Sequence, residues 1–227
     1  MKTVVALVVL VYALSPVLAQ QVETRKVGSF SGVRSSEGVD VYLKHGDTEE
    51  VRVEVTGTDP GNVVTEISGS YLKVHMRDGG RFRSVDATVY VTYTTLDKLS
   101  ASSAGNIFSD GVIRGRTLDL NASSAGSIEV ELDVTTVNVS CSSAGDVELK
   151  GRAHKLTADA SSAGEIDADE LDADEVVAEA SSGASIKVSV RKSLEARASS
   201  AGSIRYRGNP DRSHTNSSSG GSVKKSN

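Results

Sequence analysis

Serine is the residue whose repetition in this chain could signal chemistry. The sequence Ser-Ser-Ala-Gly, or a close variant, occurs seven times, with first serines at Ser102, Ser123, Ser142, Ser161, Ser181, Ser199 and Ser218. A serine hydroxyl becomes a nucleophile when an adjacent base activates it. An enzyme needs one activated serine, whereas seven copies that tolerate exchange of Ala and Gly indicate a packing role. We therefore predict no catalytic residue and no enzymatic activity.

Carboxylates in the segment 165–179 could instead hold a metal ion. The segment reads EIDADELDADEVVAE and contains no basic residue, and Ca²⁺ takes oxygen ligands. The candidate ligands are Asp167, Asp169, Asp172 and Asp174. The segment lacks the glycine-bearing loop of an EF-hand, however, and a solvated charged face explains it as well. We predict no cofactor and no bound metal, with these four aspartates as the calcium alternative.

Other residues that could take part in catalysis, metal binding or modification are scattered along the chain. The histidines His45, His75, His154 and His214 lack metal-ligand spacing, so we expect them on the surface or in turns. Three Asn-x-Ser sequons could carry N-linked glycans if the source is eukaryotic, at Asn121, Asn138 and Asn216. Cys141 is the single cysteine, which excludes an intrachain disulfide. We expect it to be a buried structural thiol in a position that other repeats fill with alanine.

The elements that position these residues recur at a nearly constant interval. Successive turns are 21, 19, 19, 20, 18 and 19 residues apart, and alternating apolar and polar residues flank each one. Alternation with period two is typical of strands with one buried face, and no stretch has amphipathic-helix spacing. One rung cannot bury its own apolar face, whereas stacked rungs share a core. The sequence predicts an all-β, parallel β-solenoid with rungs of about 19 residues.

Equivalent positions of stacked rungs lie about 4.8 Å apart and form files along the axis. We predict an inward alanine file of Ala101, Ala122, Cys141, Ala160, Ala180, Ala198 and Ser217. A second inward file is β-branched and contains Ile107, Ile128, Val147, Ile166, Ile186, Ile204 and Val223. An outward file passes from acidic to basic through Phe108, Glu129, Glu148, Asp167, Lys187, Arg205 and Lys224. A further outward file contains Glu131, Lys150, Asp169, Ser189 and Arg207, and we expect the ion pairs Asp167–Lys187 and Glu179–Arg197.

The turns themselves are predicted building elements. Their glycines are Gly105, Gly126, Gly145, Gly164, Gly183, Gly202 and Gly221, and we expect them to supply positive φ. The hydroxyls are expected to hydrogen-bond to the backbone. A side chain larger than alanine would crowd its copy on the next rung. Ladders of serine also occur in ice-binding solenoids, but the charged outward files argue against that function.

The N-terminus and the bulk charge indicate the compartment. Residues 1–19 have a positive Lys2, an apolar run and a small-residue site for cleavage after Ala19, which is typical of a secretory signal peptide. The run is short for a membrane span, and an N-terminal anchor is the alternative. The net charge of −5 provides no basic field for nucleic acid. We expect a secreted, extracellular protein (periplasmic if bacterial) that neither inserts into a membrane nor binds nucleic acid.

The mature chain is predicted to be one continuous domain, residues 20–227. Residues 100–227 form the repetitive solenoid. Residues 20–99 contain alternating segments of lower regularity, such as VDVYL, VRVEV, YLKVHM and ATVYVTY, and read as a β-strand region that caps the first regular rung. An independent small β-domain in the N-terminal region is the alternative.

The repeats resemble a known secreted family. The resemblance also includes the N-terminal segment RKVGSFSGVRSSEGVDVYLKHGDTEEVRVEV and the C-terminal segment YRGNPDRSHTNSSSGGSVKK. The family is that of putative auto-transporter adhesins with a head GIN domain. Its usual turn is Ser-Gly-Ser-Gly followed by x-Ile, and here Ser-Ser-Ala-Gly followed by x-Ile or x-Val stands in that position. The likeness extends from about Arg25 to Lys225. It implies a right-handed β-helix-like solenoid and carries over no catalytic residue.

These observations favour a secreted, non-enzymatic module with a structural or adhesive role, whose partner would be an extracellular glycan or protein. The alternative is a polysaccharide-binding or polysaccharide-active β-helix protein, since fold alone does not fix function. A lyase or hydrolase would need a cleft with paired carboxylates and usually aromatic platforms, and the rungs have no long insertions to build one. Glycan binding that is lost on charge reversal at Glu148, Asp167 and Asp169 would support a binding module. Release of reducing sugars would support an enzyme.

Overall fold

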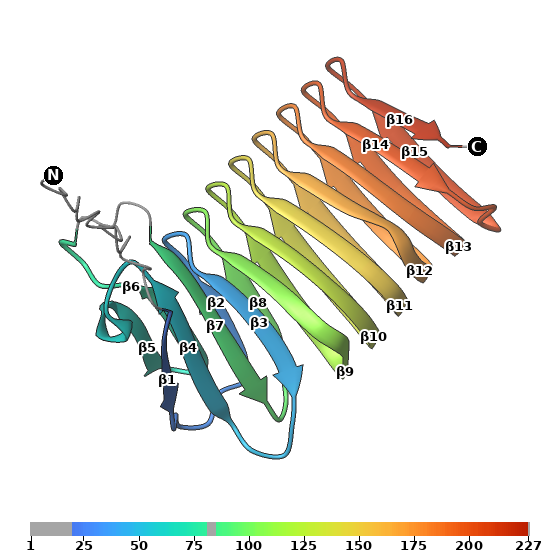
Figure 1. Ribbon diagram of the computed structural model, residues 1–227. Coiled ribbons are helices and arrows are strands. Elements are labelled where there is room, and N and C mark those ends of the chain that lie inside the picture. Colours follow the sequence, from blue (N-terminus) through green and yellow to red (C-terminus); the bar gives the residue numbers. More distant parts are fainter. Residues whose placement is uncertain (1–19, 81–84, 227) are drawn as a thin grey trace, which may run out of the picture.

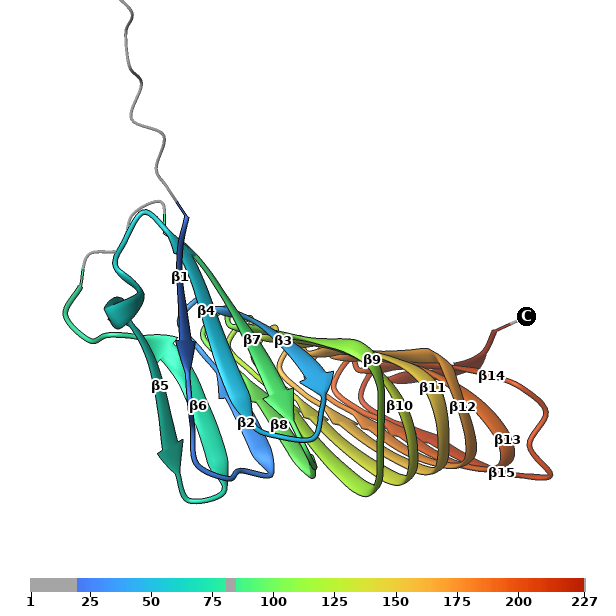
Figure 2. The ribbon, with the colours of Figure 1, turned by 60° about the horizontal axis from the view of Figure 1, so that its bottom comes forward.

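The computed structural model describes residues 20–80 and 85–226 as a flattened coil of strands in two layers (Figure 1, Figure 2). This part of the chain contains sixteen strands and a single short 3-10 turn, Pro60–Asn62. The predicted all-β solenoid is therefore confirmed. The predicted signal peptide, residues 1–19, lies outside the described residues. No helix in the described ranges is long and apolar enough to cross a membrane.

Five regular rungs form the middle of the coil. Each is a continuous strand that runs outward, bends at a wide corner and returns to the next tight turn (Figure 1). They are β9 (Asn106–Ala122), β10 (Ser127–Cys141), β11 (Asp146–Ala160), β12 (Glu165–Ala180) and β13 (Ser185–Ala198). Neighbouring rungs pair in parallel along most of their length. The last full rung is split into β14 (Ser203–Arg207) and β15 (Arg212–Ser217), and β16 (Ser222–Lys225) begins one more rung on top of β14.

The outward halves of the rungs form one layer, here the outgoing layer, and the returning halves form the return layer. The outgoing layer continues toward the N-terminus through β3 (Asp40–His45), β7 (Asp86–Tyr93), β4 (Glu50–Thr56) and β1 (Gln21–Arg25). The return layer continues through β8 (Lys98–Ala101), β2 (Gly32–Ser35), β6 (Tyr71–Met76) and β5 (Val63–Ser68). Both layers end there in antiparallel strands, β4 and β1 in one and β5 in the other. The parallel part of each layer thus gives way to antiparallel edge strands at the N-terminal end.

Both predicted inward files are present as far as Ala198 and Ile204; at the C-terminal end the prediction is wrong, because Ser217 is exposed and Val223 is only partly buried. Cys141 lies in register with Ala122 and Ala160, and it is 2 % exposed. Burial raises the pKa of its thiol to about 11, so it stays protonated at neutral pH, as expected for a thiol in an alanine position. In the β-branched file, every member from Ile107 to Ile204 is fully buried. Ser35 and Val41 extend the two files into β2 and β3.

The tight turns place positive φ on residues other than the expected glycines. In the turn Ser142–Gly145, Ser143 has a φ of 52° and Ala144 a φ of 57°, whereas Gly145 has none. The Gly145 N–H donates to the Ser142 carbonyl at 2.9 Å, which closes a type I′ turn. Six of the seven glycine predictions are wrong in this respect, for Gly105, Gly126, Gly145, Gly164, Gly202 and Gly221. Gly183, with a φ of 75°, is the one that fits.

Close approach of the preceding rung explains these glycines instead. A Cβ atom on Gly145 would lie 2.7 Å from the carbonyl oxygen of Ala122, which is closer than real Cβ atoms come. In the turn that begins at Ser181 the order is reversed, and Ala184 occupies the tight position while Gly183 takes the positive φ. Small size is therefore the shared requirement, as predicted. Elsewhere serine and alanine adopt the left-handed conformation, which costs about 1–2 kcal/mol per residue.

The hydroxyls of the turn serines do not behave as predicted. Across the described turns none donates to the backbone, and the second serine of each turn is exposed. Main-chain bonds between rungs hold the turns instead: the Ala144 N–H, for example, donates to the Ser162 carbonyl at 3.2 Å. A buried hydroxyl at Ser35, in the alanine file, does donate to the Val39 carbonyl at 2.7 Å. The parallel ladder therefore continues around each turn without help from the exposed hydroxyls.

Candidate functional site

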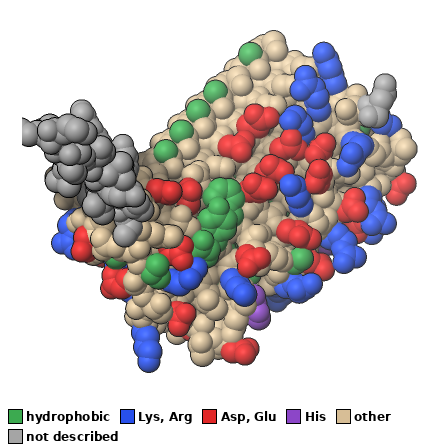
Figure 3. All heavy atoms as spheres, in the orientation of Figure 1, with side chains coloured by type: hydrophobic (Ala, Val, Ile, Leu, Met, Phe, Trp, Pro, Cys, Tyr) green, Lys and Arg blue, Asp and Glu red, His purple; other side chains and the backbone are tan. Residues whose placement is uncertain are grey.

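One file of side chains crosses the solvent face of the outgoing layer from end to end. We call it the outer file, and strand registers place its members side by side. Its members in spatial order are Arg52, Tyr90, Tyr42, Phe108, Glu129, Glu148, Asp167, Lys187, Arg205 and Lys224. Figure 3 shows this face, with a hydrophobic patch in its middle and acidic and then basic side chains toward the C-terminal rungs. The predicted order from Phe108 to Lys224 is confirmed.

Three rings in this file form an aromatic stack. The centroids of Tyr42 and Tyr90 are 5.5 Å apart and those of Tyr42 and Phe108 are 5.0 Å apart, with interplanar angles of 24° and 25°. The Arg52 guanidinium covers the outer face of the Tyr90 ring at 4.5 Å. Parallel pairing at strand spacing brings like side chains into such contact. Because the rings cover one another's faces, the stack presents mainly its edges to solvent.

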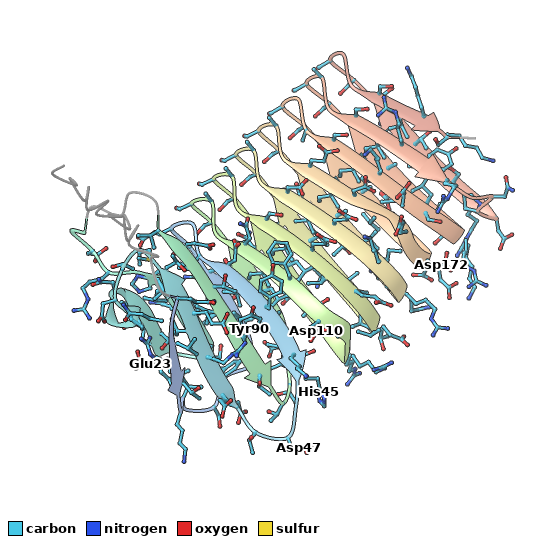
Figure 4. The ribbon with its side chains drawn as sticks, in the orientation of Figure 1. Glu23, His45, Asp47, Tyr90, Asp110 and Asp172 are labelled. Carbon is cyan, nitrogen blue, oxygen red and sulfur yellow. The ribbon has the colours of Figure 1, made fainter. Side chains whose placement is uncertain are left out.

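A hollow of about 300 Å³ lies against the aromatic stack, and we call it the aromatic hollow. The three rings form one wall. Thr92, Lys44 and Asp110, two residues further along the same three strands, stand on the other side. Tyr90 and Asp110 are labelled in Figure 4; they belong to β7 and β9, which flank β3 in the sheet. Within the described part of the chain neither Lys44 nor Asp110 forms a salt bridge.

An irregularity in β9 shapes this hollow. Phe108 pairs with Glu129 and Val112 pairs with Glu131, so the three residues Ser109–Gly111 lie opposite Val130 alone. The Glu131 N–H donates to the Ser109 hydroxyl at 2.9 Å in place of a ladder carbonyl. A bulge of this kind bends the strand and redirects side chains, and bulges are frequent beside functional sites. Here it leaves Asp110 exposed at the edge of the aromatic hollow.

The acidic part of the outer file depends on cations from neighbouring positions. Lys150 Nζ lies 2.7 Å from Glu148 and 3.6 Å from Glu129. Lys187 Nζ lies 2.7 Å from Asp167, and Arg197 lies 2.8 Å from Glu179. Both predicted ion pairs, Asp167–Lys187 and Glu179–Arg197, are therefore confirmed.

The pKa values of two carboxyl groups in this region are shifted in opposite directions. Partial burial and the neighbouring Glu165 raise the pKa of Asp146. Partial burial is the largest single influence on Asp167 and opposes its ionisation, but the hydrogen bonds from Lys187 and Asp169 and the charge of Lys187 together outweigh it, so the pKa of Asp167 is lowered. The surroundings therefore disfavour the ionised form of Asp146 and favour the ionised form of Asp167.

The four candidate calcium ligands are not gathered into one group. Asp167 is bound to Lys187, and Asp174 accepts from Lys192 at 2.8 Å and lies 3.2 Å from His154 Nδ1. Asp172 follows the corner of β12 and pairs in register with Ser189. Among the described residues, no three or more carboxylate, histidine or cysteine side chains are placed to share a metal ion.

The second predicted outward file is wrong at Asp169, which leaves the ladder, and at Ser189, which is buried with 8 % exposure. Lys150 lies opposite Glu170, and Ser189 lies opposite Asp172, because β12 carries extra residues at its corner. Asp169 is displaced from the ladder, and its N–H donates to the Asp167 carboxylate at 3.3 Å.

The remaining predicted sites lie apart from the aromatic hollow, except for His45, which ends β3 one residue beyond Lys44 and packs edge-on to Tyr93. Asn121 and Asn216 are exposed on the return layer, while the Asn138 side chain donates to Asp119 at 2.8 Å. Glycosylation of these three residues stays a prediction.

Tyr42 and Tyr90 are the residues of the candidate site that repeat analysis missed. They lie outside the regular spacing, and their strands enter the stack out of chain order, as β9, β3 and then β7. A signal was present, because in all three strands an aromatic residue directly follows a buried β-branched one: Val41, Val89 and Ile107. Because the same two-residue pattern occurs in all three strands, it predicts that the three aromatic side chains lie in one file.

The fold and this face define a class of protein: a β-solenoid with an open, laterally exposed surface built from side chains of successive strands. Comparison with known families gives the particular one. The chain belongs to the family described as putative auto-transporter adhesin, head GIN domain, whose profile matches residues 29–210. Among curated proteins, no match was found.

Solved structures share the fold at low sequence identity. A putative adhesin from Bacteroides fragilis has a TM-score of 0.81 at 19 % identity, over 93 % of this chain and 99 % of its own. A putative lipid binding protein from Parabacteroides distasonis has a TM-score of 0.70 at 17 % identity, over 92 % and 97 %. A putative adhesin from Parabacteroides merdae has a TM-score of 0.68 at 19 % identity, over 92 % and 96 %. At these identities the likeness concerns the fold alone.

Proposed function

We propose that this protein is a secreted, non-enzymatic adhesive module that binds an extracellular ligand through the solvent face of its outgoing layer. The observation that carries the proposal is the outer file, which places three stacked rings and an adjoining hollow on an open surface. Exposed apolar surface with polar neighbours is typical of interaction sites. The family description, with its reference to adhesins, supports the same role.

The non-enzymatic part of the proposal rests on the state of the candidate nucleophiles. The serines of the turns are repeated and solvent-facing, and in the described turns none is hydrogen-bonded to a histidine or carboxylate. The buried Cys141 thiol has a raised pKa, which disfavours the reactive thiolate. Export, with cleavage after Ala19, is part of the proposal and is supported by the sequence pattern of residues 1–19.

Adhesion can be measured with beads coated with residues 20–227, on surfaces that carry mucin, fibronectin, collagen or insoluble polysaccharides. We expect retention on at least one surface. A variant with Tyr42→Ser and Glu148→Lys should lose retention at least tenfold, because both residues belong to the outer file. Asp159→Lys is the matched control, since it reverses an exposed charge on the return layer.

Two results would count against the proposal. One is failure of the wild-type beads to adhere to any surface, and the other is equal loss of adhesion in the outer-file variant and in the Asp159→Lys control. Release of reducing sugars from a polysaccharide during the same incubation would instead support the alternative, a polysaccharide-active β-helix protein.

A further inference from the structure

We propose that the aromatic hollow binds a neutral sugar unit of an extracellular glycan. The inference rests on the proposed adhesive function and names its ligand. It is argued from the two walls of the aromatic hollow, from the charges around it and from its position on the open face of the sheet.

The first wall is apolar and rigid. Tyr42 is held between two rings, at 5.5 and 5.0 Å, and Arg52 covers the far end of the stack at 4.5 Å. Side chains fixed by stacking lose little conformational entropy when a ligand binds. Tyr90 is 37 % exposed, so apolar surface is available for burial. The row of ring edges that this wall presents fits a ligand with one apolar side, such as the C–H face of a pyranose ring, which would lie across the edges.

The second wall is polar and bears both signs of charge. Lys44 and Asp110 lie in register on neighbouring strands, with Thr92 on the other side of Lys44. Lys supplies hydrogen-bond donors, Asp supplies acceptors and Thr supplies both. Adjacent hydroxyl groups on one ligand can satisfy all three residues. A hydroxyl-rich ring with one apolar face thus matches both walls.

The charges around the aromatic hollow disfavour other ligand classes. A fatty chain would desolvate the charged side chains of Lys44 and Asp110 without replacing their hydrogen bonds to water, which is unfavourable. An anionic sugar or nucleic acid would meet Asp110 and, next to Phe108, the carboxylate of Glu129. A ligand without net charge meets neither penalty.

The surroundings suit a chain of sugars better than a single one. The aromatic hollow is open to solvent on the outer face, and a second hollow of about 490 Å³ begins at His45, the residue after Lys44 in β3. This second hollow is lined by Thr94, Thr95 and Arg114, among others. A longer chain can therefore continue from the first hollow toward the second.

Affinity electrophoresis tests the proposal with defined probes. Residues 20–227 are run through gels that contain dextran, mannan, xyloglucan or galactan as neutral polysaccharides, and polygalacturonate or heparin as acidic ones. We expect at least one neutral polysaccharide to retard the protein, and acidic ones to retard it at least tenfold less. The double variant Tyr42→Ser/Phe108→Ser should lose retardation at least tenfold. Tyr71→Ser is the matched control, because Tyr71 is another partly exposed ring, on β6 of the return layer.

Lys44→Met and Asp110→Asn leave the aromatic stack intact and guard against an effect of misfolding. Each should weaken retardation at least fivefold. Because the chain has no tryptophan, tyrosine emission reports the ring environment, and the retarding polysaccharide should change it in the wild type. Retardation by none of the neutral polysaccharides overturns the proposal. So does equal retardation of the wild type and the Tyr42→Ser/Phe108→Ser variant.

The bead assay separates this proposal from the function on which it rests. Beads that carry Lys44→Met or Asp110→Asn and still adhere like the wild type would overturn the sugar site while leaving the adhesive function in place. Wild-type beads that adhere to no surface would overturn both.

Discussion

The two halves of the outer file follow one packing rule with opposite results. Parallel pairing places like over like, so in the N-terminal half Tyr90, Tyr42 and Phe108 stack and stabilise one another. In the C-terminal half the same rule places Glu129, Glu148 and Asp167 next to each other. These carboxylates repel, and lysines from neighbouring positions reduce the repulsion. In-register stacking therefore repeats the same side-chain interaction along the file, whether that interaction is attractive, as for the rings, or repulsive, as for the carboxylates.

The halves also differ in regularity: the C-terminal half consists of regular rungs, whereas the N-terminal half, which contains the aromatic hollow, is less regular. The regular rungs repeat the same tight turn and the same buried files, which leaves little freedom to shape a surface. The aromatic hollow lies where β3, β7 and a bulged β9 meet, at the boundary between the regular rungs and the less regular strands. Departures from local regularity tend to mark functional positions.

The regular rungs should be the less tolerant half, and Gly145→Ala tests this most strongly. The new Cβ would lie 2.7 Å from the Ala122 carbonyl oxygen, and the rungs must separate to accept it. We expect a loss of about 2–3 kcal/mol in the free energy of unfolding, in the range for overpacked sites. Urea unfolding followed by circular dichroism measures the change.

The neighbouring substitution Ala144→Gly is the control and should act in the other direction. Ala144 has a φ of 57°, and glycine adopts that conformation without a Cβ penalty. A gain of about 1 kcal/mol is expected. If Gly145→Ala were neutral, or if Ala144→Gly were as destabilising, the explanation of the turn by close approach would be wrong.

Removal of the middle ring tests the aromatic half. Tyr42→Ser loses contacts with two rings, so we expect a loss of about 1–2 kcal/mol in the free energy of unfolding. Tyr90→Ser should lose less, because Tyr90 has one ring neighbour. A double-mutant cycle for Tyr42 and Tyr90 gives the coupling directly. A coupling energy near zero would show that the stack is a geometric by-product of strand pairing.

Repetition made the regular part of the fold predictable from sequence. Once Ala122, Cys141 and Ala160 are aligned, strand spacing alone dictates that they stack, and the facing β-branched file follows in the same way. The outer file from Phe108 onward could be read for the same reason. Each of these predictions required only that equivalent positions lie over one another.

Features that break the repeat could not be read in this way. The extra residues at the corner of β12 moved Asp169 out of its expected ladder, since spacing does not locate a bulge. The reason for Gly145 depends on how closely the Ala122 carbonyl approaches, which is a distance between rungs. Tyr42 and Tyr90 join Phe108 through strands that enter the sheet out of chain order. The aromatic half of the site therefore required the topology.

The acidic part of the outgoing layer should show the smallest effect, and pH reveals it. Burial and the neighbouring Glu165 raise the pKa of Asp146, so ionisation of this group weakens the fold. Its destabilising effect is present above the raised pKa and disappears as pH falls below the ordinary aspartate value. Asp146→Asn should thus add about 0.5 kcal/mol of stability at neutral pH. The gain should vanish below about pH 3, as thermal unfolding at both pH values can measure.

Asp174→Asn is the matched control with the opposite sign. Hydrogen bonds from Lys192 and His154 lower the pKa of Asp174, so its stabilising effect is present above the ordinary aspartate pKa and is lost as pH falls through the lowered value. This variant should be less stable than the wild type at neutral pH and equal to it in acid. If both variants shifted stability in the same direction at neutral pH, the division of these carboxylates into repelling and compensated ones would be wrong. The stacked carboxylates would then share the register of the stacked rings, but their stacking would have no measurable effect on stability.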